Sequence, residues 1–173
     1  MDVKERASRI SLFLLDVDGV LTDGRLYYTS QGEEIKVFNV RDGLGIKLAQ
    51  MAGIKIGVIS GRNSKALLNR LEELGINEVH LGFNHKMPVF ENILKSLSIS
   101  HEEVAFMGDD YVDLPLLKRV GFPLTVADAP KELKEIALYV TRARGGEGAV
   151  REAIELLLKL RNQWDEIIGQ YYA

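Results

Sequence analysis

The sequence contains no cysteine and no apolar run long enough to cross a membrane. Without cysteine, the chain can form neither disulfide bonds nor thiolate metal sites, which is compatible with a reducing compartment. The first residues carry both charge signs, whereas a signal peptide would begin with basic residues. We therefore expect a soluble protein of the cytoplasm.

The sequence also has little charge of one sign. Its formal net charge is −3 for 173 residues, and its basic residues are scattered along the chain. Such a chain creates no overall field that attracts nucleic acid. Its length and apolar content are typical of one domain with a single core. We expect residues 1–173 to form one domain that binds neither nucleic acid nor a membrane.

The most informative stretch is an apolar run that ends abruptly in carboxylates. Residues 10–15 read Ile-Ser-Leu-Phe-Leu-Leu, and Asp16 and Asp18 follow at once. An apolar run without alternation is typical of a strand buried in a parallel sheet, and ligands bind beyond the carboxyl ends of such strands. Because two adjacent carboxylates repel each other unless a cation or a proton lies between them, a hard cation such as Mg²⁺ is favoured. A calcium loop is excluded because Val20 stands where that loop needs an oxygen ligand; for this stretch alone, a solvated turn remains an alternative.

Strands and helices alternate along the rest of the chain. Apolar runs predict further strands at 55–59, 78–81, 104–107, 122–126 and 139–141, and helical patterns lie between and after them. One helix is predicted from Asp42 to Gly53, because Leu44, Leu48 and Met51 fall on one face. This alternation predicts an α/β three-layer sandwich with a mostly parallel, Rossmann-like sheet.

Two segments lie outside that alternation. Residues of about 24–39 read as a protruding β-hairpin, and the C-terminal tail of about 161–173 is unusually aromatic. Isolated hairpins are marginal in water, so this one needs a packing partner. A neighbouring subunit and the hairpin's own domain remain alternatives.

Polar side chains follow four predicted strand ends. In chain order they are Asp16 and Asp18, then Ser60, then Lys86, then Asp109, Asp110 and Asp113. Parallel topology places these strand ends on one edge of the sheet. Carboxylates, a hydroxyl and a cation are the groups needed to hold Mg²⁺ and a transferring phosphoryl group.

These four motifs, in this order, resemble those of the haloacid dehalogenase-like phosphatases. The resemblance implies that Asp16 is the nucleophile of an aspartyl-phosphate intermediate and that Asp18 is its general acid and base. It also implies that Ser60 and Lys86 bind the phosphoryl oxygens. Asp16, the backbone carbonyl of Asp18 and Asp109 would hold Mg²⁺. Asp110 and Asp113 would support these ligands or reach the ion through water.

The interval from Asp18 to Ser60 leaves little room for the cap domain that most such phosphatases insert. Within the capless branch, the chain resembles the 3-deoxy-D-manno-octulosonate 8-phosphate phosphatase family, through residues 16–24, 38–46, 60–62 and 145–152. This resemblance implies hydrolysis of that acid-sugar phosphate during synthesis of a lipopolysaccharide precursor. It further implies a homotetramer in which neighbouring subunits complete each site.

The resemblance also implies the substrate-binding residues, which are Arg62, Arg70, Gly61 and Asn39. An arginine at 62 is physically sensible, because guanidinium groups bind carboxylates bidentately. Arg70 would reach a neighbour's site, although a solvated surface cation is an alternative. Gly145, Gly146 and Gly148 precede a predicted helix and form either an anion-binding helix start or a simple loop.

Two other functions remain open. The same scaffold could act on a nine-carbon acid-sugar phosphate or on other small phosphates. The chain could instead be a phosphoryl-accepting signalling or binding module with Asp16 as the acceptor. Asp18 argues against that second reading, because an acceptor module needs no leaving-group acid. A non-catalytic scaffold is disfavoured, since none of the expected catalytic residues is missing.

Overall fold

The computed structural model describes residues 2–172, so that Met1 and Ala173, the first and last residues of the predicted domain, lie outside the described residues. Its main sheet has the strand order β5-β4-β1-β6-β7-β8, and all neighbouring strands are parallel. The strands are β1 (Leu12–Leu15), β4 (Lys55–Ser60), β5 (Glu78–Leu81), β6 (Val104–Gly108), β7 (Phe122–Thr125) and β8 (Tyr139–Val140). The predicted parallel sheet is confirmed.

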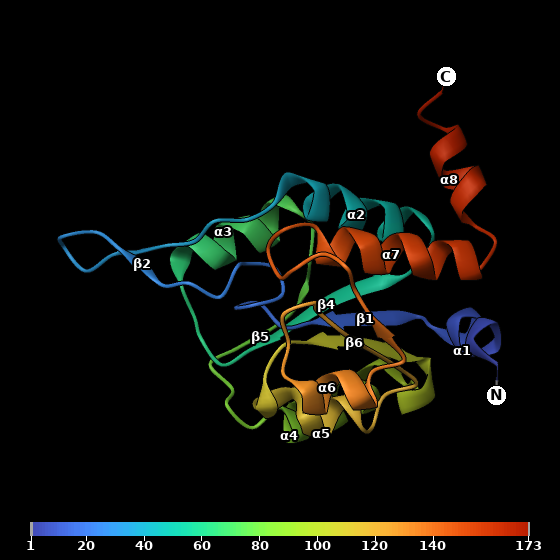
Figure 1. Ribbon diagram of the computed structural model, residues 1–173, viewed down its shortest axis with the longest axis horizontal. Coiled ribbons are helices and arrows are strands. Elements are labelled where there is room, and N and C mark those ends of the chain that lie inside the picture. The colour runs from blue at the N-terminus through green and yellow to red at the C-terminus, as the bar shows by residue number, and fades with distance from the viewer. Residues whose placement is uncertain (1, 173) are drawn as a thin grey trace.

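Helices cover both faces of this sheet. They are α1 (Val3–Arg9), α2 (Val40–Met51), α3 (Lys65–Glu73), α4 (Lys86–Leu97), α5 (Leu114–Leu117), α6 (Lys131–Ile136), α7 (Ala149–Leu160) and α8 (Trp164–Gly169), with 3-10 turns η1 (His101–Glu103) and η2 (Tyr111–Asp113). Figure 1 shows α2, α3 and α7 on one face and α4, α5 and α6 on the other. The predicted three-layer sandwich is therefore confirmed. Among residues 2–172, no helix is long and apolar enough to cross a membrane.

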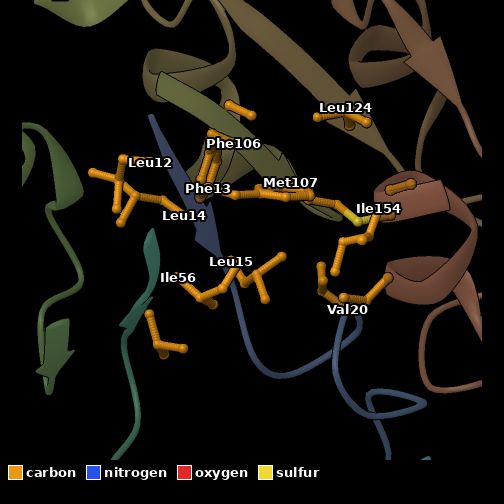
Figure 2. Packing of buried hydrophobic residues seen from close by; sticks show 14 of the residues in the cluster. Leu12, Phe13, Leu14, Leu15, Val20, Ile56, Phe106, Met107, Leu124 and Ile154 are labelled. Carbon is orange, nitrogen blue, oxygen red and sulfur yellow. The ribbon is translucent and has the colours of Figure 1, made fainter. Parts of the chain in front are cut away.

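Strand β1 lies at the centre of the core. Its four residues are all buried, and Leu15 pairs with Val58 of β4 on one side and Met107 of β6 on the other. In Figure 2 the β1 side chains lie among those of β6, and Ile154 approaches from α7. Burial on both sheet faces is what the unbroken apolar run predicted. This burial fixes the end of β1, and therefore also the position of the carboxylates that follow it.

The buried face of α2 differs from the prediction. Leu48 is buried, but Leu44 and Met51 are 40% and 45% exposed. The helix begins at Val40, and its inner face includes Gly43 and Gly45. At Gly45 a Cβ atom would lie only 3.1 Å from Arg151 Cα of α7, so the two helices pack backbone to backbone. An apolar periodicity cannot reveal a face that is built on glycine.

The hairpin protrudes from the sandwich, as predicted (Figure 1). Its strands β2 (Tyr27–Tyr28) and β3 (Glu34–Ile35) are antiparallel and shorter than expected. Tyr27 and Ile35 pair across the hairpin, and both are exposed. These side chains therefore do not pack on the hairpin's own domain.

The C-terminal tail lies at the other end of the molecule. Helix α8 packs against α7 and buries Ile167, whereas the Tyr171 hydroxyl lies 3.9 Å from Met51 Sδ at the end of α2. Figure 1 shows α8 on the side opposite the hairpin, beyond the amino ends of the strands. The tail therefore does not cover the carboxyl edge of its own sheet.

Candidate active site

A tight loop after β1 carries Asp16 and Asp18 at the carboxyl edge of the sheet. The Thr22 hydroxyl oxygen accepts the backbone N–H groups of Gly19 and Gly24, at 3.3 and 3.2 Å, and so closes the loop. Gly19 has a φ of 91°, and a Cβ atom there would overlap the Asp109 carboxylate. Only glycine permits both this backbone conformation and the close approach of Asp109.

Three carboxylates meet beside this loop. Oxygens of Asp16, Asp109 and Asp113 all lie within 4.8 Å of one another. Asp16 comes from the end of β1, whereas Asp109 and Asp113 follow β6, its neighbour in the sheet. The structure thus brings together acidic residues that are far apart in the sequence, by the strand-end geometry expected from the sequence.

Lys86 lies between two of these carboxylates. Its ammonium Nζ atom is 2.6 Å from Asp16 Oδ1 and 2.6 Å from Asp113 Oδ1, and its side chain is 3% exposed. The other oxygen of Asp113, Oδ2, accepts the backbone N–H of Asp109 at 2.9 Å. Both oxygens of Asp113 therefore have partners within the chain, which suits the supporting role predicted for it. The Asp110 carboxylate is not among these three, since it accepts the N–H of Tyr111 at 2.8 Å, but the backbone N–H of Asp110 donates to Asp113 Oδ2 at 3.4 Å.

The crowding of these acids changes their protonation. Burial, aided by the charge of Asp113, raises the pKa of Asp16 to about 6, although Lys86 acts in the opposite direction. Burial and the charges of Asp16 and Asp113 raise the pKa of Asp109 to about 8. Burial disfavours the charged form of Lys86, but the two neighbouring carboxylates outweigh it and raise the lysine pKa. One ammonium group cannot neutralise three carboxylates, and an oxygen-only donor set with excess negative charge fits Mg²⁺.

A cavity of about 270 Å³ opens over this cluster. Seven of the predicted site residues line it: Asp16, Asp18, Ser60, Gly61, Lys86, Asp109 and Asp110. Ser60 is buried, and its hydroxyl oxygen accepts the N–H of Arg62 at 3.3 Å. Phe83 and Asn84 also line the cavity and were not predicted. Because they follow β5 at the same sheet edge, the strand-end rule could have found them.

Asp18 is held by side chains that reach it from outside the cavity. Lys36 Nζ of the hairpin lies 2.6 Å from Asp18 Oδ1 and 2.6 Å from Glu34 Oε1. Arg62 lies beside the pair, with Nη2 3.1 Å from Glu34 Oε2 and Nε 3.8 Å from Asp18 Oδ2. The sequence analysis missed Lys36 and Glu34. The sequence feature that could have indicated them is the alternation of side chains along the hairpin strand, which places positions 34 and 36 on one face.

Asn39 and Arg70 lie outside this cavity. Asn39 caps α2 by accepting the N–H of Arg41 at 2.8 Å, and its amide donates to the Gly146 carbonyl at 3.2 Å. Arg70 pairs with Glu73 at 3.2 Å. Within this chain neither residue reaches the cluster, so substrate binding by them stays a prediction that requires a neighbouring subunit.

The glycine-rich segment before α7 packs against the tight loop that follows β1. The N–H of Gly146 donates to the Val20 carbonyl at 3.0 Å, and that of Gly145 donates to Asp128 Oδ1 at 3.2 Å. A Cβ atom at Gly145 would overlap the carbonyl oxygen of Gly19. Of the two alternatives left by the sequence, these contacts favour a loop that supports the active site, because its amides already have acceptors.

Comparison with known proteins defines the class first. Residues 84–154 match the family model described as haloacid dehalogenase-like hydrolase. That match covers less than half of the chain; together with the nearly full-length relative described next, it makes the chain a haloacid dehalogenase-like hydrolase. The chain is 46% identical over 169 residues to the 3-deoxy-D-manno-octulosonate 8-phosphate phosphatase of Escherichia coli (strain K12), an alignment that spans 98% of this chain and 90% of that protein. The chain therefore belongs to the 3-deoxy-D-manno-octulosonate 8-phosphate phosphatase family.

Solved structures agree with this assignment. The phosphatase from Moraxella catarrhalis, in complex with a magnesium ion, a phosphate ion and a KDO molecule, is 38% identical and has a TM-score of 0.95, with 97% of each chain covered. The cobalt-bound form of the deoxy-D-mannose-octulosonate 8-phosphate phosphatase from Haemophilus influenzae is 41% identical and has a TM-score of 0.89. That likeness covers 92% of this chain and 94% of the Haemophilus chain. The shared fold thus extends over nearly the whole molecule.

Proposed function

We propose that this protein is a Mg²⁺-dependent phosphomonoesterase that hydrolyses 3-deoxy-D-manno-octulosonate 8-phosphate to the free sugar acid and phosphate, a step toward a lipopolysaccharide precursor. The observation that carries this proposal is the position of Asp16. It stands buried between Lys86 and Asp109 in a cavity that also contains Asp18. The names of the relatives from Escherichia coli and Moraxella catarrhalis support the substrate and the metal.

In the first step, a carboxylate oxygen of Asp16 attacks phosphorus, and the bond from phosphorus to the sugar oxygen breaks. Asp18 gives its proton to the departing oxygen. In the second step, Asp18 takes a proton from water, and that water displaces Asp16 from phosphorus. Ser60 and Lys86 bind the phosphoryl oxygens, whose charge develops during both transfers.

The carboxylate cluster supplies the metal ligands of this proposal. Asp16, the backbone carbonyl of Asp18 and Asp109 would hold Mg²⁺, and the ion would supply charge neutralisation for the phosphoryl group. Asp113 has both oxygens engaged, with Lys86 and the Asp109 amide, so it would orient these groups. Asp110, which also lines the cavity, would act through water.

Arg62 and Gly61 would bind the sugar acid, and Asn39 and Arg70 would contribute from a neighbour. The guanidinium of Arg62 is paired with Glu34, so the substrate carboxylate would share or replace that partner. A homotetramer in the cytoplasm, built from one capless domain per chain, belongs to the same proposal. Its support is the exposed apolar side of the hairpin, where Tyr27 and Ile35 lie, together with the family resemblance.

The test is a phosphate-release assay with and without Mg²⁺, on 3-deoxy-D-manno-octulosonate 8-phosphate, a nine-carbon acid-sugar phosphate and simple alkyl phosphates. We expect the highest kcat/KM for the first substrate and no turnover after chelation of the metal. A preference for the nine-carbon substrate, or a flat profile, would reject the specific substrate. Phosphorylation of the protein without turnover would instead favour an acceptor module.

A further inference from the structure

The hairpin places a buried cation against a predicted catalytic carboxyl group. Lys36 extends from the hairpin to Asp18, and only 3% of its side chain is exposed. Its Nζ atom lies 2.6 Å from Asp18 Oδ1 and equally close to Glu34 Oε1. Removing an ammonium group from water is costly, so a lysine remains buried and charged only with partners of this kind.

Lys36 gives Asp18 its principal contact. Among residues 2–172, Lys36 donates the hydrogen bond that the structure shows to the Asp18 carboxylate. Arg62 Nε lies 3.8 Å from the other oxygen, Oδ2, which exceeds hydrogen-bond distance. The lysine therefore holds Asp18 through Oδ1, whereas Oδ2 accepts no hydrogen bond from residues 2–172.

We propose that Lys36 is a positioning residue of the phosphatase site, which holds the Asp18 carboxyl group where it exchanges protons with the leaving oxygen and with water. This inference rests on the proposed function. When the bond from phosphorus to the leaving oxygen breaks, the proton on Asp18 Oδ2 passes to that oxygen. The carboxylate that remains is stabilised by the ammonium group of Lys36. In the second step the same oxygen takes a proton from the attacking water.

The same geometry makes the hairpin part of the catalytic site. Lys36 and Glu34 face Asp18 and Arg62, whereas Tyr27 and Ile35 on the opposite side are exposed. Lys36 thus links the protruding hairpin to Asp18, the proposed general acid and base.

The test compares leaving groups. Phenyl phosphate and 4-nitrophenyl phosphate transfer the same group and lack a carboxylate, but the phenolate oxygen of the first is the more basic and needs the proton more. The ratio kcat/KM reports the steps up to cleavage of that bond. For Lys36→Met we expect a loss of about 10-fold or more on phenyl phosphate and less than about 2-fold on 4-nitrophenyl phosphate, since general acid catalysis helps the poorer leaving group most. Lys36→Arg should recover part of the loss.

Lys131→Met is the matched control. Lys131 also pairs with a carboxylate, Glu135 at 3.3 Å, but its side chain is 84% exposed. Lys131→Met should leave kcat/KM unchanged on both phenyl phosphate and 4-nitrophenyl phosphate. Hydrogen exchange of the metal-free proteins provides a measurement that does not depend on activity. The backbone amides of residues 27–37 should exchange faster in Lys36→Met than in the wild type. In Lys131→Met they should exchange at the wild-type rate.

Equal losses on the two substrates would reduce Lys36 to a structural residue and overturn the inference. Unchanged exchange in the hairpin would overturn it as well. If the wild-type protein is active and Lys36→Met has the same kcat/KM on both substrates, the role of Lys36 is rejected and the proposed function is not. A wild-type protein that hydrolyses no phosphate ester would overturn the proposed function and, with it, this inference.

Discussion

The ammonium group of Lys86 lies 2.6 Å from Asp16 Oδ1, although the two residues are 70 positions apart in the chain. Lys86 is the first residue of α4, and Asp16 follows β1. The same ammonium group reaches Asp113, which is fully buried. One lysine therefore ties three separate segments together at the carboxyl edge, and its removal should affect both folding and chemistry.

We predict that Lys86→Met destabilises the protein by about 3 kcal/mol, because it leaves the buried carboxylates of Asp16 and Asp113 without their cation. Urea unfolding in the presence of EDTA measures this loss. Added Mg²⁺ should recover part of it, since a second cation then occupies the cluster. Lys131→Met, which removes an exposed pair, should change the free energy of unfolding by less than about 1 kcal/mol. Equal effects of the two substitutions would contradict the prediction.

The proposed role of Asp16 as the nucleophile can be tested separately from the fold. We expect Asp16→Asn to lower phosphate release by at least about 10³-fold, because an amide cannot form the aspartyl-phosphate. Its thermal unfolding temperature should not fall, because burial already opposes the charge at this position and raises the pKa of Asp16. Malachite-green phosphate detection and circular dichroism measure the two quantities. Turnover equal to that of the wild type would reject the role of Asp16.

Much of this site could be predicted, because strand ends in a parallel sheet are set by local sequence. Asp16, Ser60 and Asp109 each follow an apolar run, and their convergence requires only that the runs pair in parallel. Lys36 could not be predicted in this way. Its role depends on the angle at which the hairpin leaves the sandwich, and no local pattern encodes that angle.

Helix α1 (Val3–Arg9) was missed for a similar reason. Its residues carry both charge signs and only Ala7 is buried, so the segment has no apolar periodicity. The helix is held instead by Arg161 from the far end of the chain, whose Nη1 atom donates to the carbonyls of Ala7 and Ile10 at 3.1 and 2.7 Å. A contact between the two ends of the sequence leaves no local signal.

Magnesium binding should strengthen as the pH rises. Without metal, the pKa of Asp16 is raised to about 6 and that of Asp109 to about 8, chiefly by burial. Protons compete with the cation for these oxygens, so the metal-free folded state takes up protons that Mg²⁺ must displace. We predict a larger rise in unfolding temperature on adding Mg²⁺ at pH 9 than at pH 6, and loss of most of this difference in Asp109→Asn. The same rise at both pH values would contradict the prediction.

Asp42 should make the protein less stable toward neutral pH. Burial raises the pKa of Asp42 to about 6, although its Oδ1 atom accepts the N–H of Arg151 at 2.8 Å. The folded pKa is higher than the unfolded value, so the folded protein binds the proton more tightly, and the free energy of unfolding falls as pH rises through about 4 to 6. Between pH 4 and pH 8, we expect Asp42→Asn to gain about 2 kcal/mol relative to the wild type.

Denaturant unfolding at several pH values measures that change. Asp165→Asn, at an exposed position in α8, is the control and should follow the wild type at every pH. A difference between Asp42→Asn and the wild type that stays constant with pH would show that Asp42 does not titrate in this range.

The C-terminal tail tests whether a neighbouring subunit completes the site. Because α8 lies away from the cavity of its own chain, the tail can affect turnover directly only in a second chain (Figure 1). We predict that deletion after Gln170 lowers turnover while leaving stability unchanged, since Tyr171 and Tyr172 are exposed. Deletion after Gln163 should lower turnover as well and also reduce stability by about 1–2 kcal/mol, because it removes the buried Ile167. Full-length Asp16→Asn, itself inactive, should restore activity to the shorter chain when mixed with it. Full activity of both deletions would show that the tail has no part in the site.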